Sequence, residues 1–115
     1  MTAPVSNQSG TTSALSINTE TTLGSAITSA GTYQLKLNMG NLAGGATPDI
    51  LELRVYSKTL SGDTKELIDI WTFVGAQVVP ILYTPPYPEL YYLEFTLKQT
   101  QGTGRTFKWN ILKLA

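Results

Sequence analysis

Residues 102–105 place two glycines and an arginine between two hydrophobic runs, and such a step can either bind a phosphate or form a turn. A phosphate-binding loop needs a helix directly after its glycines, because the N–H groups at the helix start hold the anion. Here residues 107–111 alternate between apolar and polar as a strand does, and no Gly-Lys-Ser/Thr sequence completes a P-loop. The sequence therefore predicts the tip of a β-hairpin, where the glycines adopt positive φ and Arg105 could bind a partner's carboxylate.

Few other side chains could carry acid–base, nucleophilic or metal chemistry. The chain has no histidine and no cysteine, which removes Ser-His and Cys-His arrangements, thiolate metal sites and disulfides. Most acids fall at predicted turns or outward strand positions, where a solvated surface charge is the default: Asp49, Glu52, Asp63, Glu66, Asp69, Glu89 and Glu94. Asp69 shares a strand face with Leu67 and Trp71, which favours a strand edge or an interface over a buried acid. Calcium-loop spacing is absent too, so we expect no enzymatic activity, no cofactor and no metal site.

Tyrosines gather around three prolines in the stretch YTPPYPELYY, residues 83–92. A tyrosine combines a flat apolar ring with a hydrogen-bonding tip, so this Tyr-Pro loop could form a platform for a sugar ring or a protein partner. The alternative is a loop whose tyrosines cover the end of the domain. Both interpretations stay open, because Tyr91 and Tyr92 point to opposite faces of a strand and cannot both be core. The rigidity that prolines give to the loop favours a protein contact over an adaptable pocket.

Charge is scarce and balanced along the chain. Charged residues make up 14% of the 115 residues, against roughly 25% in an average soluble domain, and eight basic residues offset eight acidic ones. Because no cluster of Lys or Arg exists, we expect no nucleic-acid partner. We expect no membrane partner either, since no apolar run approaches the ~20 residues of a span, and residues 1–22 lack a signal-peptide pattern. So little charge suggests that part of the surface is covered by something other than water.

Strand patterns dominate the chain from residue 13 onward. Residues 33–39 and 51–58 alternate between apolar and polar side chains, and a turn at residues 61–64 predicts a hairpin with the next strand. That next strand, residues 66–74, is apolar on both faces, with Ile68, Ile70 and Val74 on one side and Leu67, Trp71 and Phe73 on the other. It is therefore either a central strand or a strand whose second face is covered by another subunit. Pro80 predicts either an edge position or a bulge for the strand that it interrupts.

These strands predict an all-β fold, a single antiparallel β-sandwich over residues 13–115 that is jelly-roll-like and has seven to eight strands. A short first strand is expected at residues 14–17, and residues 90–99 and 105–114 are expected to pair as the hairpin named above. The prolines of the Tyr-Pro loop are expected to exclude regular structure there. Residues 1–12 predict a flexible N-terminal arm, and the alternative is an arm that orders on a neighbouring subunit.

Two stretches taken together resemble one group of proteins: residues 29–62, which include AGTY, ELR and LSG, and residues 93–114, which include FTLKQT, GTGR and the pair Phe107 and Trp109. These segments occur in the same order in small β-rich proteins encoded in the structural modules of tailed bacteriophages and related proviruses. The resemblance covers most of the chain from about residue 29, but not the arm or the Tyr-Pro loop. It implies a virion component that is made in the host cytoplasm.

Within that group, the resemblance implies a head decoration or cement protein that binds the outer capsid surface and stabilises contacts between capsomers. Its partners would be the major capsid protein and further copies of itself in a homotrimer, and a glycan could be a further ligand. Partner contacts are expected at Pro4, Val5, Trp71, Phe73, Tyr83, Pro86, Tyr87 and Arg105. The alternatives are a glycan- or receptor-binding sandwich module of a spike or fibre, and a head–tail junction protein.

Overall fold

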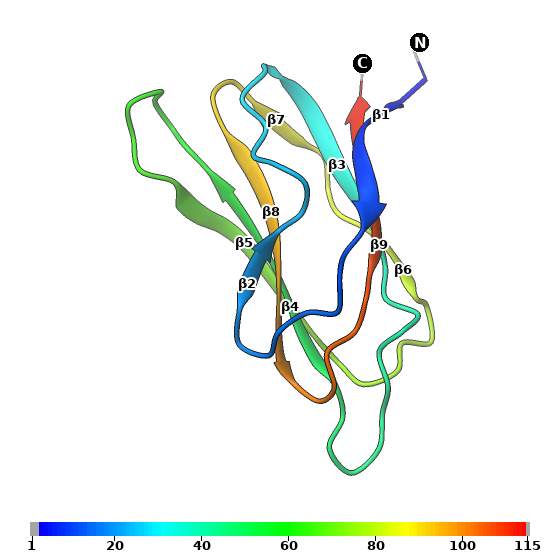
Figure 1. Cartoon of the computed structure of the whole chain (residues 1–115). Coiled ribbons are helices and arrows are strands. Elements are labelled where there is room, and N and C mark those ends of the chain that lie inside the picture. Colours follow the sequence, from blue (N-terminus) through cyan, green and yellow to red (C-terminus); the bar gives the residue numbers. More distant parts are fainter. Residues whose placement is uncertain (1–2, 115) are drawn as a thin grey trace.

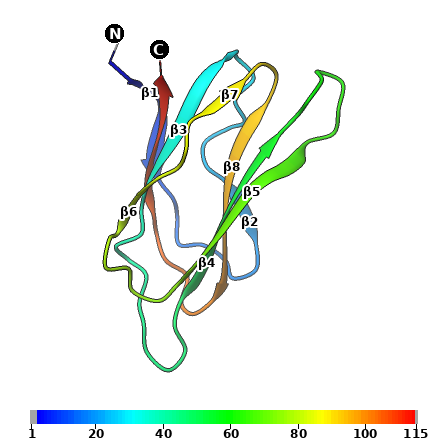
Figure 2. The same cartoon turned by 180° about the vertical axis from the view of Figure 1, so that it is seen from behind.

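The computed structural model describes residues 3–114, which fold into two antiparallel β-sheets packed face to face (Figures 1 and 2). This range contains no helix, and its nine strands are β1 (Val5–Thr11), β2 (Glu20–Thr22), β3 (Gly31–Asn38), β4 (Ile50–Ser57), β5 (Glu66–Val74), β6 (Ile81–Tyr83), β7 (Tyr87–Glu89), β8 (Leu93–Gln101) and β9 (Lys108–Leu114). The five-stranded sheet has the order β1-β9-β3-β6, with β7 also paired to β3, and the four-stranded sheet has the order β2-β8-β4-β5. The predicted all-β sandwich is therefore confirmed.

The chain crosses from one sheet to the other at nearly every connection. Only the steps from β4 to β5 and from β6 to β7 stay within a sheet. As in a jelly roll, strands that are far apart in the sequence become neighbours, and the expected topology is confirmed with one short strand added. The clearest case is β9, which lies between β1 and β3 and so joins the two ends of the chain in one sheet (Figure 1).

The core lies between the sheets and is built from the inward residues of the alternating strands. On β3 these are Tyr33, Leu35 and Leu37, which are fully buried and alternate with half-buried polar residues, as a side-chain period of two requires. The opposite sheet supplies Leu51, Leu53, Val55, Leu93, Phe95 and Leu97. Removing these apolar surfaces from water is the main favourable contribution to folding, which is why the alternation predicted these strands correctly.

The predicted hairpin between residues 90–99 and 105–114 is wrong. β8 pairs with β2 and β4, whereas β9 pairs with β1 and β3, so the two strands belong to different sheets. Residues 102–107 cross from one sheet to the other instead of reversing the chain within one. Phe95 and Ile111 are both buried in the core, where their strands pack face to face rather than edge to edge. Turn chemistry alone does not distinguish these two arrangements.

The structure places most of the predicted flexible arm in a strand. Residues 1–2 lie outside the described range, but β1 pairs with β9 from Val5 to Thr11. Its side chains are exposed, except for the half-buried Gln8, so main-chain hydrogen bonds rather than apolar burial hold the strand. Gln8 adds a local anchor, because its Nε2 donates to the carbonyl of Ser25 (3.1 Å) and its Oε1 accepts from the Ser25 N–H (2.9 Å). A prediction based on apolar content cannot detect a strand of this kind.

β5 is an edge strand, paired only with β4, and is therefore not the central strand that its composition allowed (Figure 2). The register with β4 shifts between Val55 and Tyr56, which leaves Ile68 without an opposite residue. Ile68 lies on the outward face with Ile70 and Val74, as the period of two requires, and the bulge accounts for the exposure of Leu67, which strict alternation would turn inward. Trp71 and Phe73 turn inward and pack against the core.

Two smaller predictions also fail. Residues 14–17 form no strand, although Leu15 is buried and its N–H donates to the carbonyl of Arg105 (3.1 Å). The prolines of the Tyr-Pro loop do not exclude regular structure, because Pro88 lies in the short strand β7 opposite Thr32. Among the described strands β7 pairs with β3 alone. No second strand therefore needs a hydrogen bond from the N–H that Pro88 lacks. The edge position predicted after Pro80 is confirmed by β6.

Substitutions on the two faces of β5 are expected to lower the free energy of unfolding by different amounts. Trp71→Ala should lower the free energy of unfolding by about 2–4 kcal/mol, because it removes a large ring that packs on the core. Ile70→Ala is the matched control on the exposed face of the same strand and should cost less than about 1 kcal/mol. Urea denaturation followed by tryptophan fluorescence and circular dichroism measures both. Equal losses in the two variants would contradict the assignment of the faces.

Candidate interaction surface

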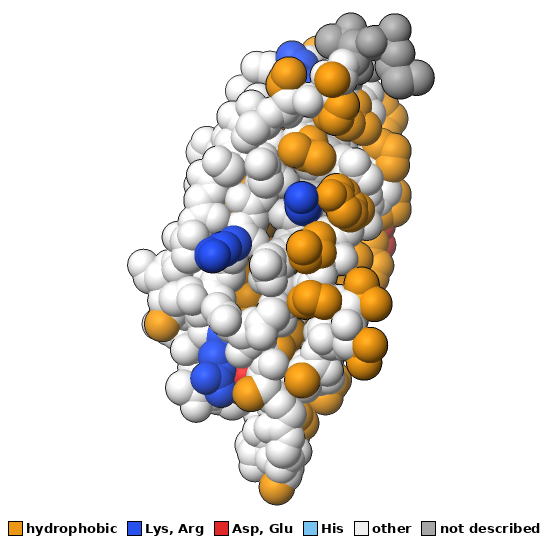
Figure 3. All heavy atoms as spheres, turned by 90° about the vertical axis from the view of Figure 1, so that its right-hand side faces the viewer, with side chains coloured by type: hydrophobic (Ala, Val, Ile, Leu, Met, Phe, Trp, Pro, Cys, Tyr) orange, Lys and Arg blue, Asp and Glu red, His pale blue; other side chains and the backbone are white. Residues whose placement is uncertain are grey.

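Exposed apolar side chains gather along one side of the sandwich, where the edge strand β5 and the segment 76–91 lie. We call this set the apolar edge; it consists of Leu67, Ile68, Ile70, Val74, Val78, Val79, Ile81, Tyr83, Leu90 and Tyr91. Figure 3, which faces the five-stranded sheet, shows hydrophobic side chains along one border of that face. Val78 is 100% exposed and Val79 is 73% exposed. Single exposed apolar residues are ordinary, but ten of them on β5 and the segment that follows it mark a candidate contact surface.

The eight side chains predicted to contact a partner do not lie together. Four are exposed, namely Pro4, Val5, Tyr83 and Pro86, and four are half-buried, namely Trp71, Phe73, Tyr87 and Arg105. Val5 belongs to β1, at the opposite edge of its sheet from β6, so the arm and the apolar edge are separate surfaces. Trp71, Phe73 and Tyr87 pack against the core, which gives them a structural role. The exposed apolar side chains of β5 are instead Leu67, Ile68, Ile70 and Val74.

Sequence reasoning missed the valine pair at positions 78 and 79, which is the most exposed part of the apolar edge. The sequence feature that could have identified this pair is its apolar character directly before Pro80. The strand that follows Pro80, β6, lies at the edge of its sheet. Tyr83 was identified correctly as exposed, at 53%, but the Nζ of Lys36 lies 5.4 Å from its ring centroid. A cation therefore already covers part of that ring.

Tyr87 ties the two sheets together beneath the apolar edge. Its hydroxyl donates a hydrogen bond to Oδ2 of Asp69 on β5 (2.9 Å), and its ring centroid lies 6.1 Å from that of Phe95. Burial, and then the hydrogen bond to Asp69, raise the pKa of Tyr87 above its ordinary value, which keeps the phenol protonated as a donor. Asp69 lies on an edge strand, as predicted, although it is half-buried there.

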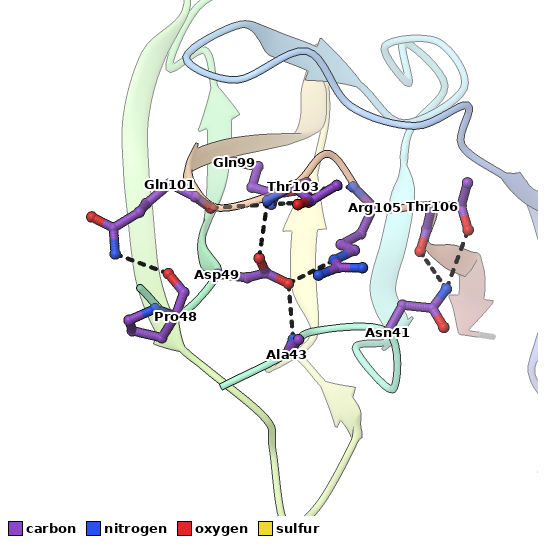
Figure 4. A network of polar contacts seen from close by, with 9 residues as sticks. All are labelled: Asn41, Ala43, Pro48, Asp49, Gln99, Gln101, Thr103, Arg105 and Thr106. Carbon is purple, nitrogen blue, oxygen red and sulfur yellow. Dashed lines mark hydrogen bonds and ion pairs between the residues drawn. The ribbon is translucent and has the colours of Figure 1, made fainter. Parts of the chain in front are cut away.

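The glycine-rich step at residues 102–105 surrounds an anion after all, and the anion is the carboxylate of Asp49 (Figure 4). Asp49 is 2% exposed, so the prediction of a solvated acid is wrong for it. Its oxygens accept hydrogen bonds from Arg105 Nε (2.7 Å), from the Ala43 N–H (2.8 Å) and from the Thr103 N–H (3.2 Å). The carboxylate that Arg105 binds thus belongs to its own chain, and its contact with another protein stays a prediction.

Gln99 holds the other side of this loop. Its Nε2 donates to the carbonyls of Gln101 (3.1 Å) and Thr103 (2.7 Å), and its Oε1 accepts from the Arg105 N–H (3.0 Å). Gln99 is fully buried, so these bonds replace the water that its amide has lost. Both sides of the loop are therefore fixed by buried polar groups, and we call this arrangement the Asp49 clasp.

Acids on the outer face of the four-stranded sheet are likewise bound by donors of the same chain. Glu94 accepts hydrogen bonds from Lys65 Nζ (2.6 Å), Thr22 Oγ1 (2.5 Å) and Tyr92 (3.0 Å). Burial alone would raise the pKa of Glu94, but these hydrogen bonds outweigh it and hold the pKa below its usual range. A second group on this face consists of Glu20, Glu52, Arg54, Tyr56 and Thr96. On this face, charged residues that stand singly in the sequence are thus joined by ion pairs and hydrogen bonds.

Residues 3–114 contain no group of three or more acidic, histidine or cysteine residues that could hold a metal ion. They also contain no helix that is long and apolar enough to cross a membrane. Comparisons of the chain with protein-family models, with curated proteins and with solved structures gave no match.

Loss of the buried carboxylate should destabilise the fold in a pH-dependent way. Burial raises the pKa of Asp49, but the bonds from Arg105, Ala43 and Thr103 outweigh it, so the net pKa lies below the ordinary value of 3.8. Asp49→Asn should therefore cost about 2–3 kcal/mol at pH 7, because Arg105 loses its counter-charge while staying partly solvated. Urea unfolding at pH 7 measures this cost, and Glu66→Gln on exposed β5 is the control.

The sign of the pH effect follows from the lowered pKa of Asp49. The unfolded chain binds the proton first as the pH falls, so the stabilisation is complete above about pH 5 and is lost as the pH passes through the folded-state pKa. The difference between wild type and Asp49→Asn should therefore shrink in acid. A difference that stays constant down to about pH 2 would contradict the role of the ionised carboxylate.

Gly102 should tolerate no side chain. It has a φ of 94°, and a Cβ placed there would overlap Oδ1 and the backbone of Asp49. Gly102→Ala should lower the free energy of unfolding by about 2 kcal/mol or more, whereas Gly62→Ala, in an open turn, should change it by less than about 0.5 kcal/mol. Thermal and urea unfolding measure both variants, and an unchanged Gly102→Ala protein would contradict the clasp.

Proposed function

We propose that this chain is a virion structural protein of a tailed bacteriophage, and that it decorates the outer head surface and stabilises contacts between capsomers. The observation that carries the proposal is the apolar edge, a set of ten exposed apolar residues along one side of a small sandwich of low charge. Such a surface is costly to leave in water, so a partner that covers it is expected. The resemblance of residues 29–62 and 93–114 to proteins of phage structural modules supports a virion as the place where that partner is found.

The proposed mechanism is mechanical. The partners are the major capsid protein and two further copies of this chain in a closed homotrimer on the outer capsid surface. In a cyclic trimer each subunit presents one patch to a different patch of the next subunit. The apolar edge supplies the first patch, and bridging adjacent capsomers adds contacts that the bare shell lacks. The proposal assigns no chemical step to any residue.

The experiment that tests this role is a measurement of copy number in purified particles from the source of the chain. Quantitative mass spectrometry against the major shell protein should find this chain near one copy per shell subunit, or a simple fraction of it. A dozen copies or fewer would contradict decoration and favour the head–tail junction or a fibre. Absence from particles would overturn the virion role and favour the glycan- or receptor-binding alternative.

The apolar edge can be tested by charge insertion. Ile70→Lys and Val79→Lys, combined in one variant, should abolish self-association and lower incorporation into particles by about tenfold or more, because two lysines must then be desolvated in the contact. Thr28→Lys, at an exposed position outside this edge, is the matched control and should behave as wild type. Sedimentation of the isolated chain and rebinding to stripped particles measure these effects. Wild-type assembly and rebinding by the double variant would remove the apolar edge from the proposal.

A further inference from the structure

The outer face of the five-stranded sheet carries two rows of side chains that the strand registers place side by side. The first row is Tyr83, Lys36, Asn110 and Ser9, and the second is Ile81, Asn38, Lys108 and Thr11, taken across β6, β3, β9 and β1. In each row a lysine stands directly opposite an asparagine on the neighbouring strand. The two lysines therefore occupy diagonal corners of a four-residue block.

This block borders a hollow of about 280 Å³ in the sheet face. The hollow is lined by Lys36, Asn38, Ile81, Lys108, Trp109 and Asn110. Figure 3, which looks onto this face, shows Lys and Arg side chains standing apart on a mostly uncharged surface. Ile81 gives the hollow an apolar wall, so it can hold the aliphatic part of a side chain as well as a charged group.

All four polar side chains that line the hollow can donate hydrogen bonds. Oδ1 of Asn38 accepts the N–H of Gly40 (2.9 Å), and Oδ1 of Asn110 accepts the hydroxyl of Ser6 (2.7 Å). These bonds fix both amides so that their NH₂ groups remain to donate, and a lysine ammonium can only donate. Neither Lys36 nor Lys108 takes part in a salt bridge among residues 3–114. A concave site with two amide donors and two positive charges that have no acidic partner favours an anion.

We propose that this hollow binds carboxylate side chains of an acidic segment of a partner protein. The two lysines lie on diagonal positions, whose Cβ atoms are roughly 7–8 Å apart, and this spacing suits two separate single charges better than one compact phosphate. The apolar wall suits the methylenes of glutamate. A sugar acid is less suited, because the exposed ring beside the hollow, that of Tyr83, already has the Nζ of Lys36 5.4 Å from its centroid. The site does not depend on the virion role proposed above.

The test uses the isolated, ¹⁵N-labelled chain and a blocked tetraglutamate peptide, with tetraglutamine as the neutral control. Titration at low ionic strength should shift the side-chain amide signals of Asn38 and Asn110 with tetraglutamate alone. Lys36→Gln combined with Lys108→Gln should weaken binding by about tenfold or more, since each charge-assisted hydrogen bond contributes about a factor of ten. Lys58→Gln combined with Lys98→Gln removes the same charge elsewhere and should leave binding within about twofold.

Several results would overturn the proposal. Equal weakening in the two double variants would show attraction to net charge rather than to the hollow. Displacement of tetraglutamate by an equal concentration of inorganic phosphate would assign the site to small oxyanions, and tighter binding of trigalacturonate would assign it to an acidic sugar. Shifts confined to signals outside the hollow would place the contact elsewhere. Because the measurement needs no particle, its failure is distinguishable from failure of the decoration role.

Discussion

The buried carboxylate of Asp49 is the constraint on which one end of this sandwich depends. A charged group at 2% exposure is tolerated only when hydrogen bonds replace its water, and this requirement determines the loop around it. Thr103 and Ala43 turn their N–H groups toward it, Arg105 supplies the counter-charge, and Gly102 leaves the space that it occupies. The loop that links the two sheets between β8 and β9 thus owes its shape to an acid on the connection between β3 and β4.

The sandwich presents surfaces of different chemistry as a result of its topology. The four-stranded sheet faces outward with acids that are bound by donors of the same chain, and the five-stranded sheet faces outward with lysines and amides. Between them, β5 and the segment 76–91 form a side with little charge. A chain with zero formal net charge can therefore offer a cationic hollow and an apolar edge at once, because the acids of the four-stranded face are paired with Arg54 and Lys65 there, whereas Lys36 and Lys108 form no salt bridge among residues 3–114.

The sequence was sufficient for the fold class and for the inward residues of β3, β4 and β8, because apolar alternation reports burial directly. The prediction from sequence failed where main-chain hydrogen bonds between strands determine which strands are neighbours. β1 buries almost no apolar surface, and β8 and β9 look like a hairpin although they lie in different sheets. The role of Asp49 was also invisible, since its partners lie more than fifty residues away along the chain, at Thr103 and Arg105. Of the predicted contact residues, Tyr83 is exposed, whereas Trp71 and Phe73 turn toward the core, because an apolar strand does not reveal which face turns inward, and their contact with a partner stays a prediction.

The position of β9 has a consequence for the order in which the protein can be made. This strand lies inside the five-stranded sheet, between β1 and β3, yet it is synthesised after both of them. Until residues up to 114 have left the ribosome, the edges of β1 and β3 that β9 later covers have no partner in the chain, and β1 has little apolar surface to hold it elsewhere. The four-stranded sheet, by contrast, has all its strands by residue 101. The nascent chain is thus expected to complete one sheet first, and to close the other only once β9 has left the ribosome.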